Sequence, residues 1–136
     1  GSFTHGRACD PVVTDGNFAY VTLHSGSQCG GTSNELDIID IKNIEQAFLV
    51  KSYPMTSPTG LSKDGDLLFI CDGSEIKLYN AADANDIKAV GSIETKEPYD
   101  VIAGNKIALV VAKDGLYQYD YSDVHHMHQL SFIATK

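Results

Sequence analysis

The sequence predicts an all-β protein, namely a β-propeller segment of about three four-stranded antiparallel blades. Short runs of apolar, β-branched and aromatic residues recur along the chain, separated by clusters of Gly, Asp, Asn and Ser. One motif also recurs with a fixed period, since Leu36–Asp40, Ile76–Asn80 and Leu116–Asp120 each begin 40 residues after the one before. A period near 40 residues with about four strands per unit is typical of a propeller blade.

The 40-residue register divides the chain into a remnant and three blades. Residues 1–6 resemble the end of an outer strand of a preceding blade, and blades follow at 7–55, 56–95 and 96–136. From innermost to outermost, we expect strands at 10–14, 17–23, 35–41 and 47–54, then at 58–62, 66–71, 75–80 and 88–94, and finally at 98–103, 106–112, 116–121 and 129–134. Asp-Gly and Gly-Asn pairs between these runs supply the tight turns.

Two segments depart from the simple strand pattern. The alanine-rich stretch at 80–90 would also suit a short helix, but the register makes it the connection between a third and an outer strand. Blade 1 carries an inserted Gly/Ser-rich loop at 24–34, between its second and third strands. Long surface loops are tolerated at small entropic cost and often carry function.

Three blades do not close a ring. Closed propellers typically have about four to eight blades, and each blade packs only on its neighbours. We therefore expect either further blades from a longer parent chain or self-association of this chain, and no stable isolated monomer.

Charge excludes two classes of partner. The chain holds 10 Lys and Arg against 18 Asp and Glu, for a net charge of −8. Such a chain repels phosphate backbones, so we expect neither nucleic-acid nor anionic-membrane binding. We also expect no transmembrane segment, because no apolar run approaches the roughly 18 residues that span a bilayer.

The three cysteines fall into two groups. Cys9 precedes the innermost strand of blade 1 and Cys29 lies in the inserted loop. Because chain direction alternates between strands, both lie on the same side of the blade, which predicts a Cys9–Cys29 disulfide and an oxidising compartment. The alternative is two reduced thiols. Cys71 ends an apolar strand and is expected to be a small buried residue.

One mouth of the central channel is the predicted binding site. The connections that lead into the innermost strands, such as 56–59 and 96–100, converge there beside the inserted loop. The candidate residues for a protein or glycan ligand are His5, Arg7, Asp10, His24, Gln28, Tyr99 and Asp100. The alternative is that these polar groups only satisfy backbone groups at strand ends.

Metal and catalytic signals are weak. The cluster of His125, His126 and His128 is the most metal-like, but adjacent histidines diverge and no full ligand set accompanies them. We expect neither a metal nor another cofactor. No catalytic constellation emerges, since Ser25 stands outside a Gly-x-Ser-x-Gly elbow.

The motif Leu36-Asp37-Ile38-Ile39-Asp40 with Ile41-Lys42-Asn43 resembles the LVIVD-repeat family. Residues 7–23, 51–55 and 114–123 resemble the C-terminal part of LVIVD-repeat lipoproteins of Bacteroidetes. The resemblance implies a bacterial cell-envelope propeller with further blades upstream and a lipidated cysteine outside this chain. The family's usual proline after Asn is replaced by Ile44, and its activity is not established, so no catalytic residues carry over.

These observations lead to one functional hypothesis and one alternative. We expect a non-enzymatic binding or scaffold propeller, periplasmic or at the cell surface as part of an outer-membrane lipoprotein. The alternative is part of a glycan-acting hydrolase or lyase whose site is completed by missing blades.

Overall fold

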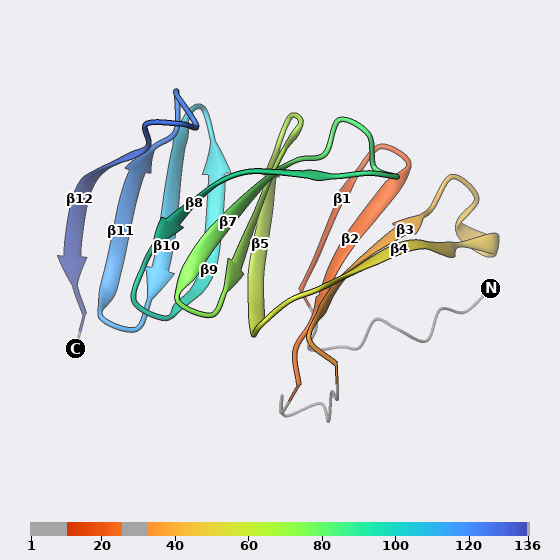
Figure 1. Ribbon diagram of the computed structural model, residues 1–136, viewed down its shortest axis with the longest axis horizontal. Helices are drawn as coiled ribbons and strands as arrows, with labels where there is room; N and C mark the ends of the chain where they lie inside the picture. Colours follow the sequence, from red (N-terminus) through yellow and green to blue (C-terminus); the bar gives the residue numbers. More distant parts are fainter. Residues whose placement is uncertain (1–10, 26–32, 136) are drawn as a thin grey trace.

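The computed structural model describes residues 11–25 and 33–135. Within these ranges the regular structure consists of twelve strands and one 3-10 turn, arranged as three four-stranded antiparallel sheets. The sheets follow one another in chain order along the longest axis of the molecule (Figure 1). The predicted all-β fold of three propeller-like blades is confirmed.

The first sheet has the strand order β1-β2-β3-β4. Its strands are β1 (Val12–Asp15), β2 (Phe18–Leu23), β3 (Glu35–Asp40) and β4 (Phe48–Pro54), and the 3-10 turn η1 (Ile44–Gln46) precedes β4. The Asn43 side chain caps η1 by accepting a hydrogen bond from the Glu45 amide.

The second and third sheets repeat this meander. The second comprises β5 (Pro58–Asp64), β6 (Leu67–Asp72), β7 (Glu75–Asn80) and β8 (Lys88–Glu94). The third comprises β9 (Pro98–Gly104), β10 (Ile107–Ala112), β11 (Gly115–Asp120) and β12 (His128–Ala134). Residues 81–87 form turns and bends without a helix, as the register predicted. Tertiary packing explains this, because Ala81, Ala84 and Ile87 are buried.

The hairpins use the residues that their turns require. Gly65, in the two-residue loop between β5 and β6, has a φ of +57°. In the third sheet Asn105 and Lys106 take φ values of +52° and +68°, the positive pair of a type I′ turn. A type I′ turn matches the right-handed twist of the two strands that it joins.

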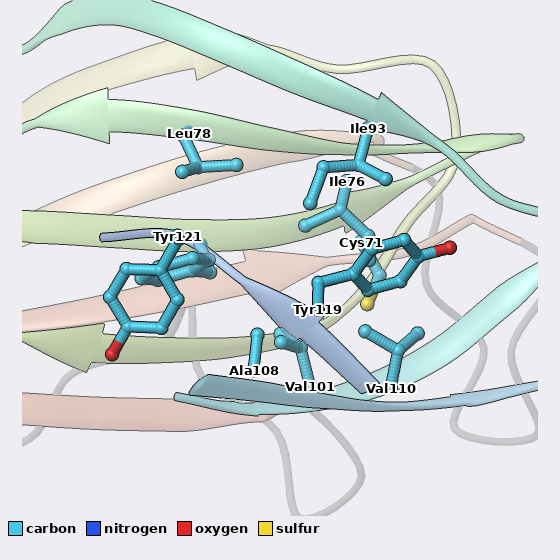
Figure 2. Packing of buried hydrophobic residues seen from close by; sticks show 10 residues of the cluster. Cys71, Ile76, Leu78, Ile93, Val101, Ala108, Val110, Tyr119 and Tyr121 are labelled. Atoms are coloured by element: carbon cyan, nitrogen blue, oxygen red, sulfur yellow. The ribbon is translucent and has the colours of Figure 1, made fainter. Parts of the chain in front are cut away.

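The second sheet lies between the other two and buries both its faces. Neighbouring residues of β6 serve opposite interfaces, because Ile70 packs toward the first sheet and Cys71 toward the third. The interface with the first sheet is formed by Tyr20, Leu36, Ile38, Leu61, Leu68, Ile70, Ala81, Ala84 and Ile87. The interface with the third sheet is formed by Phe69, Cys71, Ile76, Leu78, Ile93, Val101, Ala108, Val110, Tyr119 and Tyr121 (Figure 2).

The innermost strands approach closely at the centre. A Cβ added to Gly60 of β5 would lie 2.6 Å from the Cα of Asp100 and 2.8 Å from the carbonyl oxygen of Tyr99, both in β9. Threonine hydroxyls tie the same region together. Thr22 donates to the Thr59 carbonyl at 2.6 Å, and Thr59 donates to the Pro98 carbonyl at 3.1 Å. The three sheets are therefore joined close to their innermost strands by polar contacts as well as by buried apolar side chains.

The Asp-Gly hairpins add a second kind of tie between sheets. The Tyr121 hydroxyl, which follows β11, donates to the carboxylate of Asp64 in the second sheet at 2.6 Å. The ammonium of Lys63 likewise contacts the carboxylate of Asp15 in the first sheet. In each case the hairpin aspartate of one sheet meets a side chain from the next.

The described part of the chain contains no helix with the length and apolar character needed to span a membrane.

Candidate functional site

A hollow of about 450 Å³ opens at the predicted mouth. We call it the mouth pocket. It lies where β2 ends, where β5 and β9 begin, and where β6 turns into β7. Its lining residues come from all three sheets: His24, Ser57, Thr59, Gly73, Ser74, Glu97, Pro98 and Tyr99.

A histidine and a serine meet in this pocket. The Nδ1 atom of His24 lies 3.4 Å from the Oγ of Ser57, and both residues are half-buried. His24 follows β2, whereas Ser57 precedes β5, so the contact joins the first and second sheets. This contact places His24 beside the connection that leads into β5.

A buried aspartate fixes the segment that carries Ser57. The Asp72 carboxylate accepts hydrogen bonds from the amide of Ser57 at 2.6 Å and from the amide of Thr56 at 3.0 Å. The Lys77 ammonium donates to the same carboxylate at 2.7 Å. Burial by itself would raise the pKa of Asp72, but the bonds from Lys77, Ser57 and Thr56 outweigh it and hold the pKa below its usual value. An ionised side chain thus holds the segment that carries Ser57.

Glu97 has an unusual backbone at the pocket rim. Its φ is +46°, in the left-handed region that non-glycine residues rarely adopt. The Lys113 amide donates to the Glu97 carbonyl at 3.1 Å, and the Lys113 ammonium lies 3.5 Å from the Glu97 carboxylate. Such strain persists only where neighbouring groups hold the backbone in place, and it clusters at binding sites.

Tyr99 supplies the aromatic surface of the pocket. Its side chain is 51% exposed, although it stands beside the buried Pro98. An exposed ring flanked by hydroxyl, imidazole and carboxylate groups suits a ligand that offers both an apolar face and polar edges.

The sequence-based site residues are placed as follows. His24 and Tyr99 line the mouth pocket. Asp100 adjoins it without lining it, since its carboxylate accepts from the Val101 amide at 2.9 Å and lies against Gly60. The remaining candidates and the predicted disulfide lie outside the described residues: His5, Arg7, Asp10, Gln28, Cys9 and Cys29.

Sequence reasoning missed the β6–β7 turn as part of the site. Gly73 and Ser74 line the pocket, and the Asp72–Lys77 pair stabilises the segment beside it. A usable signal was present, because this turn is the equivalent in blade 2 of the inserted loop in blade 1. Loops at equivalent positions lie at the same mouth.

The histidine cluster lies elsewhere, in the connection between β11 and β12. His126 contacts the Asp123 carboxylate at 2.9 Å, and the His125 amide donates to the other oxygen of the same carboxylate. His125 and His126 border a hollow of about 560 Å³ beside β8, while His128 begins β12. Within the described ranges no group of three or more His, Cys, Asp or Glu side chains is placed to hold a metal ion.

Cys71 is buried at the interface of the second and third sheets, as the sequence predicted. Burial and the nearby Asp100 charge raise the pKa of its thiol to about 12. A thiol that stays protonated is a poor nucleophile, so Cys71 serves packing.

Comparison with known proteins shows the fold. No family model matches the chain, and no curated protein matches it. Among solved structures, the N-terminal domain of Nup159 is similar over 91% of this chain, with a TM-score of 0.55 and 14% identity. A functionally unknown protein from Desulfotomaculum acetoxidans DSM 771 is similar over 93%, with a TM-score of 0.67 and 11% identity.

The chain spans only part of these structures, 30% of the first and 56% of the second. At such low identity the likeness carries information on the fold alone. Together with the three repeated four-stranded sheets, it defines the chain as a propeller-like all-β segment.

Proposed function

We propose that this segment is a non-enzymatic binding module that presents the mouth pocket to a protein or glycan ligand. The observation that supports it is the convergence of three sheets on one hollow, with His24 from the first, Ser57 from the second and Tyr99 from the third. A site built across blades depends on the whole fold, and loops carried by a rigid scaffold are where binding residues concentrate.

We expect ligand binding to depend most on Tyr99, because its aromatic ring is exposed in the pocket. Aromatic side chains in partly enclosed positions often dominate recognition. We expect Tyr99→Ala to weaken the binding of a protein or oligosaccharide ligand by about tenfold or more. Phe48→Ala is the matched control, because Phe48 is a similarly exposed aromatic residue on β4, an outer strand away from the pocket.

The test uses the whole chain on an array of purified bacterial cell-envelope oligosaccharides and in pull-downs from envelope extracts. The proposal predicts a ligand whose signal falls with Tyr99→Ala and persists with Phe48→Ala. A ligand bound equally by wild type and Tyr99→Ala would show that the mouth pocket is not the binding site.

The alternative function, as part of a glycan-acting hydrolase or lyase, is favoured by the contact between His24 and Ser57 at 3.4 Å. A histidine beside a hydroxyl is the arrangement of a general base and its nucleophile. Glu97 adds one carboxylate to the same pocket, whereas glycoside hydrolysis ordinarily uses two. Turnover of any arrayed oligosaccharide that Ser57→Ala abolishes would favour this alternative over binding alone.

We also propose that the chain is part of an LVIVD-repeat protein, a lipoprotein of the bacterial outer membrane that is periplasmic or exposed at the cell surface. The proposal rests on the motif Leu36–Asp40 and on its recurrence in the third strand of each sheet, β3, β7 and β11. Cell fractionation with an antibody against this chain tests the localisation, and recovery in the cytosolic fraction would contradict it.

A further inference from the structure

A second hollow lies outward of the mouth pocket, between the second and third sheets. We call it the outer hollow, and its volume is about 460 Å³. It is bordered by the β6–β7 turn, by the end of β8 with the segment that follows it, and by strands β11 and β12. Its lining includes Ser74, Glu94, Lys96, Tyr117, Tyr119 and Gln129.

The outer hollow and the mouth pocket meet at Ser74, which lines both. The connection from β8 to β9 borders them in turn, since residues 94–96 line the outer hollow and residues 97–99 line the mouth pocket. This connection leads from the outermost strand of the second sheet to the innermost strand of the third. The two hollows therefore follow one another from the periphery of the molecule toward its centre.

Backbone hydrogen bonds hold the walls of the outer hollow. The Thr95 amide donates to the Ser74 carbonyl at 3.0 Å, and the Lys113 amide donates to the Lys96 carbonyl at 3.3 Å. The hydroxyls of Thr95 and Tyr119 lie 3.1 Å apart in a buried contact. Because these backbone groups are already paired, an extended peptide cannot use them to add a strand, so recognition falls to the side chains.

Two tyrosines give the outer hollow an aromatic surface. The rings of Tyr117 and Tyr119 stack, with centroids 5.9 Å apart and planes inclined by 10°. Tyr119 is buried and Tyr117 is half-buried, with its hydroxyl held by the Asp114 carboxylate at 2.8 Å. The residue 40 positions before Tyr117 is Lys77, which instead donates to Asp72. The third sheet thus presents an aromatic ring where the second sheet has an ion pair.

Each hollow combines an aromatic ring with polar side chains. Tyr99 accompanies the Glu97 carboxylate in the mouth pocket, and Tyr117 accompanies Glu94 and Gln129 in the outer hollow. A sugar ring offers an apolar face that can stack on an aromatic ring, and hydroxyls at its edge that can bond to carboxylates and amides. The repetition of this combination favours a ligand made of several sugar units.

Charge and volume narrow the class of ligand further. Among the described lining residues, Glu94 and Glu97 contribute two carboxylates against the one ammonium of Lys96, and the whole chain carries a net charge of −8. Acidic polymers are therefore repelled. Each hollow alone has the volume of an ordinary small-molecule pocket, which is about 300–1,000 Å³. The two together suit a neutral ligand longer than a single sugar.

We propose that the mouth pocket and the outer hollow form one elongated site for a neutral oligosaccharide. This inference rests on the proposed function and adds to it the class of ligand and the path of the ligand, from Tyr99 past Ser74 to Tyr117. Sugar units that extend beyond the mouth pocket gain contacts in the outer hollow, so affinity should rise with the length of the oligosaccharide.

The test measures binding of the whole chain to an array of neutral bacterial cell-envelope oligosaccharides graded in length, beside acidic oligosaccharides and extended peptides. We expect wild type to bind a neutral oligosaccharide, and the longer members of its series more tightly than the shorter ones. Tyr117→Ala should weaken binding of the long members by about tenfold and leave binding of the short members unchanged. Tyr99→Ala should weaken binding of both.

Tyr53→Ala is the matched control for Tyr117→Ala. Tyr53 is also half-buried on an outer part of a sheet and makes one hydrogen bond, from the Ile87 amide, but it lines neither hollow. Its removal should leave binding at every length unchanged. Gln129→Ala, at an exposed residue of β12, keeps the test decisive if Tyr117→Ala does not fold, and circular dichroism verifies the fold of each variant.

Three results would overturn the proposal. The first is a ligand that depends on Tyr99 but binds equally at all lengths and equally to Tyr117→Ala and Gln129→Ala, which would leave the mouth pocket as the whole site. The second is an array on which no neutral oligosaccharide binds, or on which an acidic oligosaccharide or a peptide is preferred. The third is binding that Tyr117→Ala weakens and Tyr99→Ala does not, and only this result would also contradict the proposed function of the mouth pocket.

Discussion

At the scale of single residues, Gly60 marks the place where the innermost strands leave no room for a side chain. An added Cβ would lie 2.6 Å from the Cα of Asp100, which is backbone that cannot swing aside. We expect Gly60→Ala to lower the free energy of unfolding by about 1–3 kcal/mol, as overpacking does elsewhere. Urea unfolding measures the loss.

Gly104→Ala is the matched control for Gly60→Ala. Gly104 ends β9, the strand that Gly60 approaches, but an added Cβ there meets nothing within 4 Å. Its stability should stay close to that of wild type. Equal losses in the two variants would show that the close approach of β5 and β9 is not what Gly60 provides.

The Asp72 carboxylate should make the free energy of unfolding depend on pH in the acid range. Its pKa is lowered in the folded chain, so its contribution is present above the ordinary carboxyl pKa near 4 and is lost as the pH falls through the lowered value. We expect Asp72→Asn to reduce stability at pH 7 by about 2 kcal/mol and to flatten the fall in stability below pH 4. Urea unfolding at a series of pH values measures both effects.

Asp86→Asn is the control for Asp72→Asn. The pKa of the Asp86 carboxyl is also lowered, but by the exposed ammonium of Lys88. Because this pair is screened by solvent, the variant should resemble wild type at pH 7. If Asp72→Asn retained the full acid sensitivity of wild type, the buried contacts of Asp72 would not be its source.

At the scale of strands and sheets, the Tyr121–Asp64 hydrogen bond ties the third sheet to a hairpin of the second. The Tyr121 hydroxyl donates to the Asp64 carboxylate at 2.6 Å, and Tyr121 is 1% exposed. We expect Tyr121→Phe to destabilise the chain by about 1.5–3 kcal/mol, the range for a hydrogen bond to a charged group.

A double-mutant cycle with Asp64→Asn measures this contact directly. The two substitutions should be non-additive, with a coupling between about 0.5 and 3 kcal/mol. Additive losses would mean that the two side chains stabilise the fold separately. Tyr117→Phe serves as a control, because the Tyr117 hydroxyl bonds Asp114 close by in the sequence and joins no two sheets.

The strands were predictable because their signals are local. Alternating apolar residues, Asp-Gly turns and the 40-residue recurrence of Leu36–Asp40 together specify which residues pair and which face is buried. The same register correctly set aside a helix at 80–90. Contacts between sheets could not be predicted in the same way, since no local sequence pattern indicates that Tyr121 reaches Asp64 or that Gly60 must be small.

The candidate site was predictable only in outline. Propeller geometry placed His24 and Tyr99 at one mouth, because loops at equivalent positions converge. The buried Asp72–Lys77 pair and the left-handed backbone of Glu97 depend on long-range packing, so they became visible only in the structure. The Cys9–Cys29 disulfide stays a prediction, since both residues lie outside the described part of the chain.

At the scale of the whole molecule, the three sheets are unequal because they have different neighbours. The second sheet is covered on both faces, while the face of the third sheet that points away from the second exposes residues such as Leu109, whose equivalent in the second sheet, Phe69, is buried. The repeat thus accounts for the residues that form the core between the sheets.

Ligand binding by matched variants tests the central claim most directly, because residues from all three sheets line the mouth pocket. We expect a ligand whose binding weakens about tenfold or more in Tyr99→Ala and is unchanged in Phe48→Ala. Equal binding by wild type and Tyr99→Ala would contradict the account.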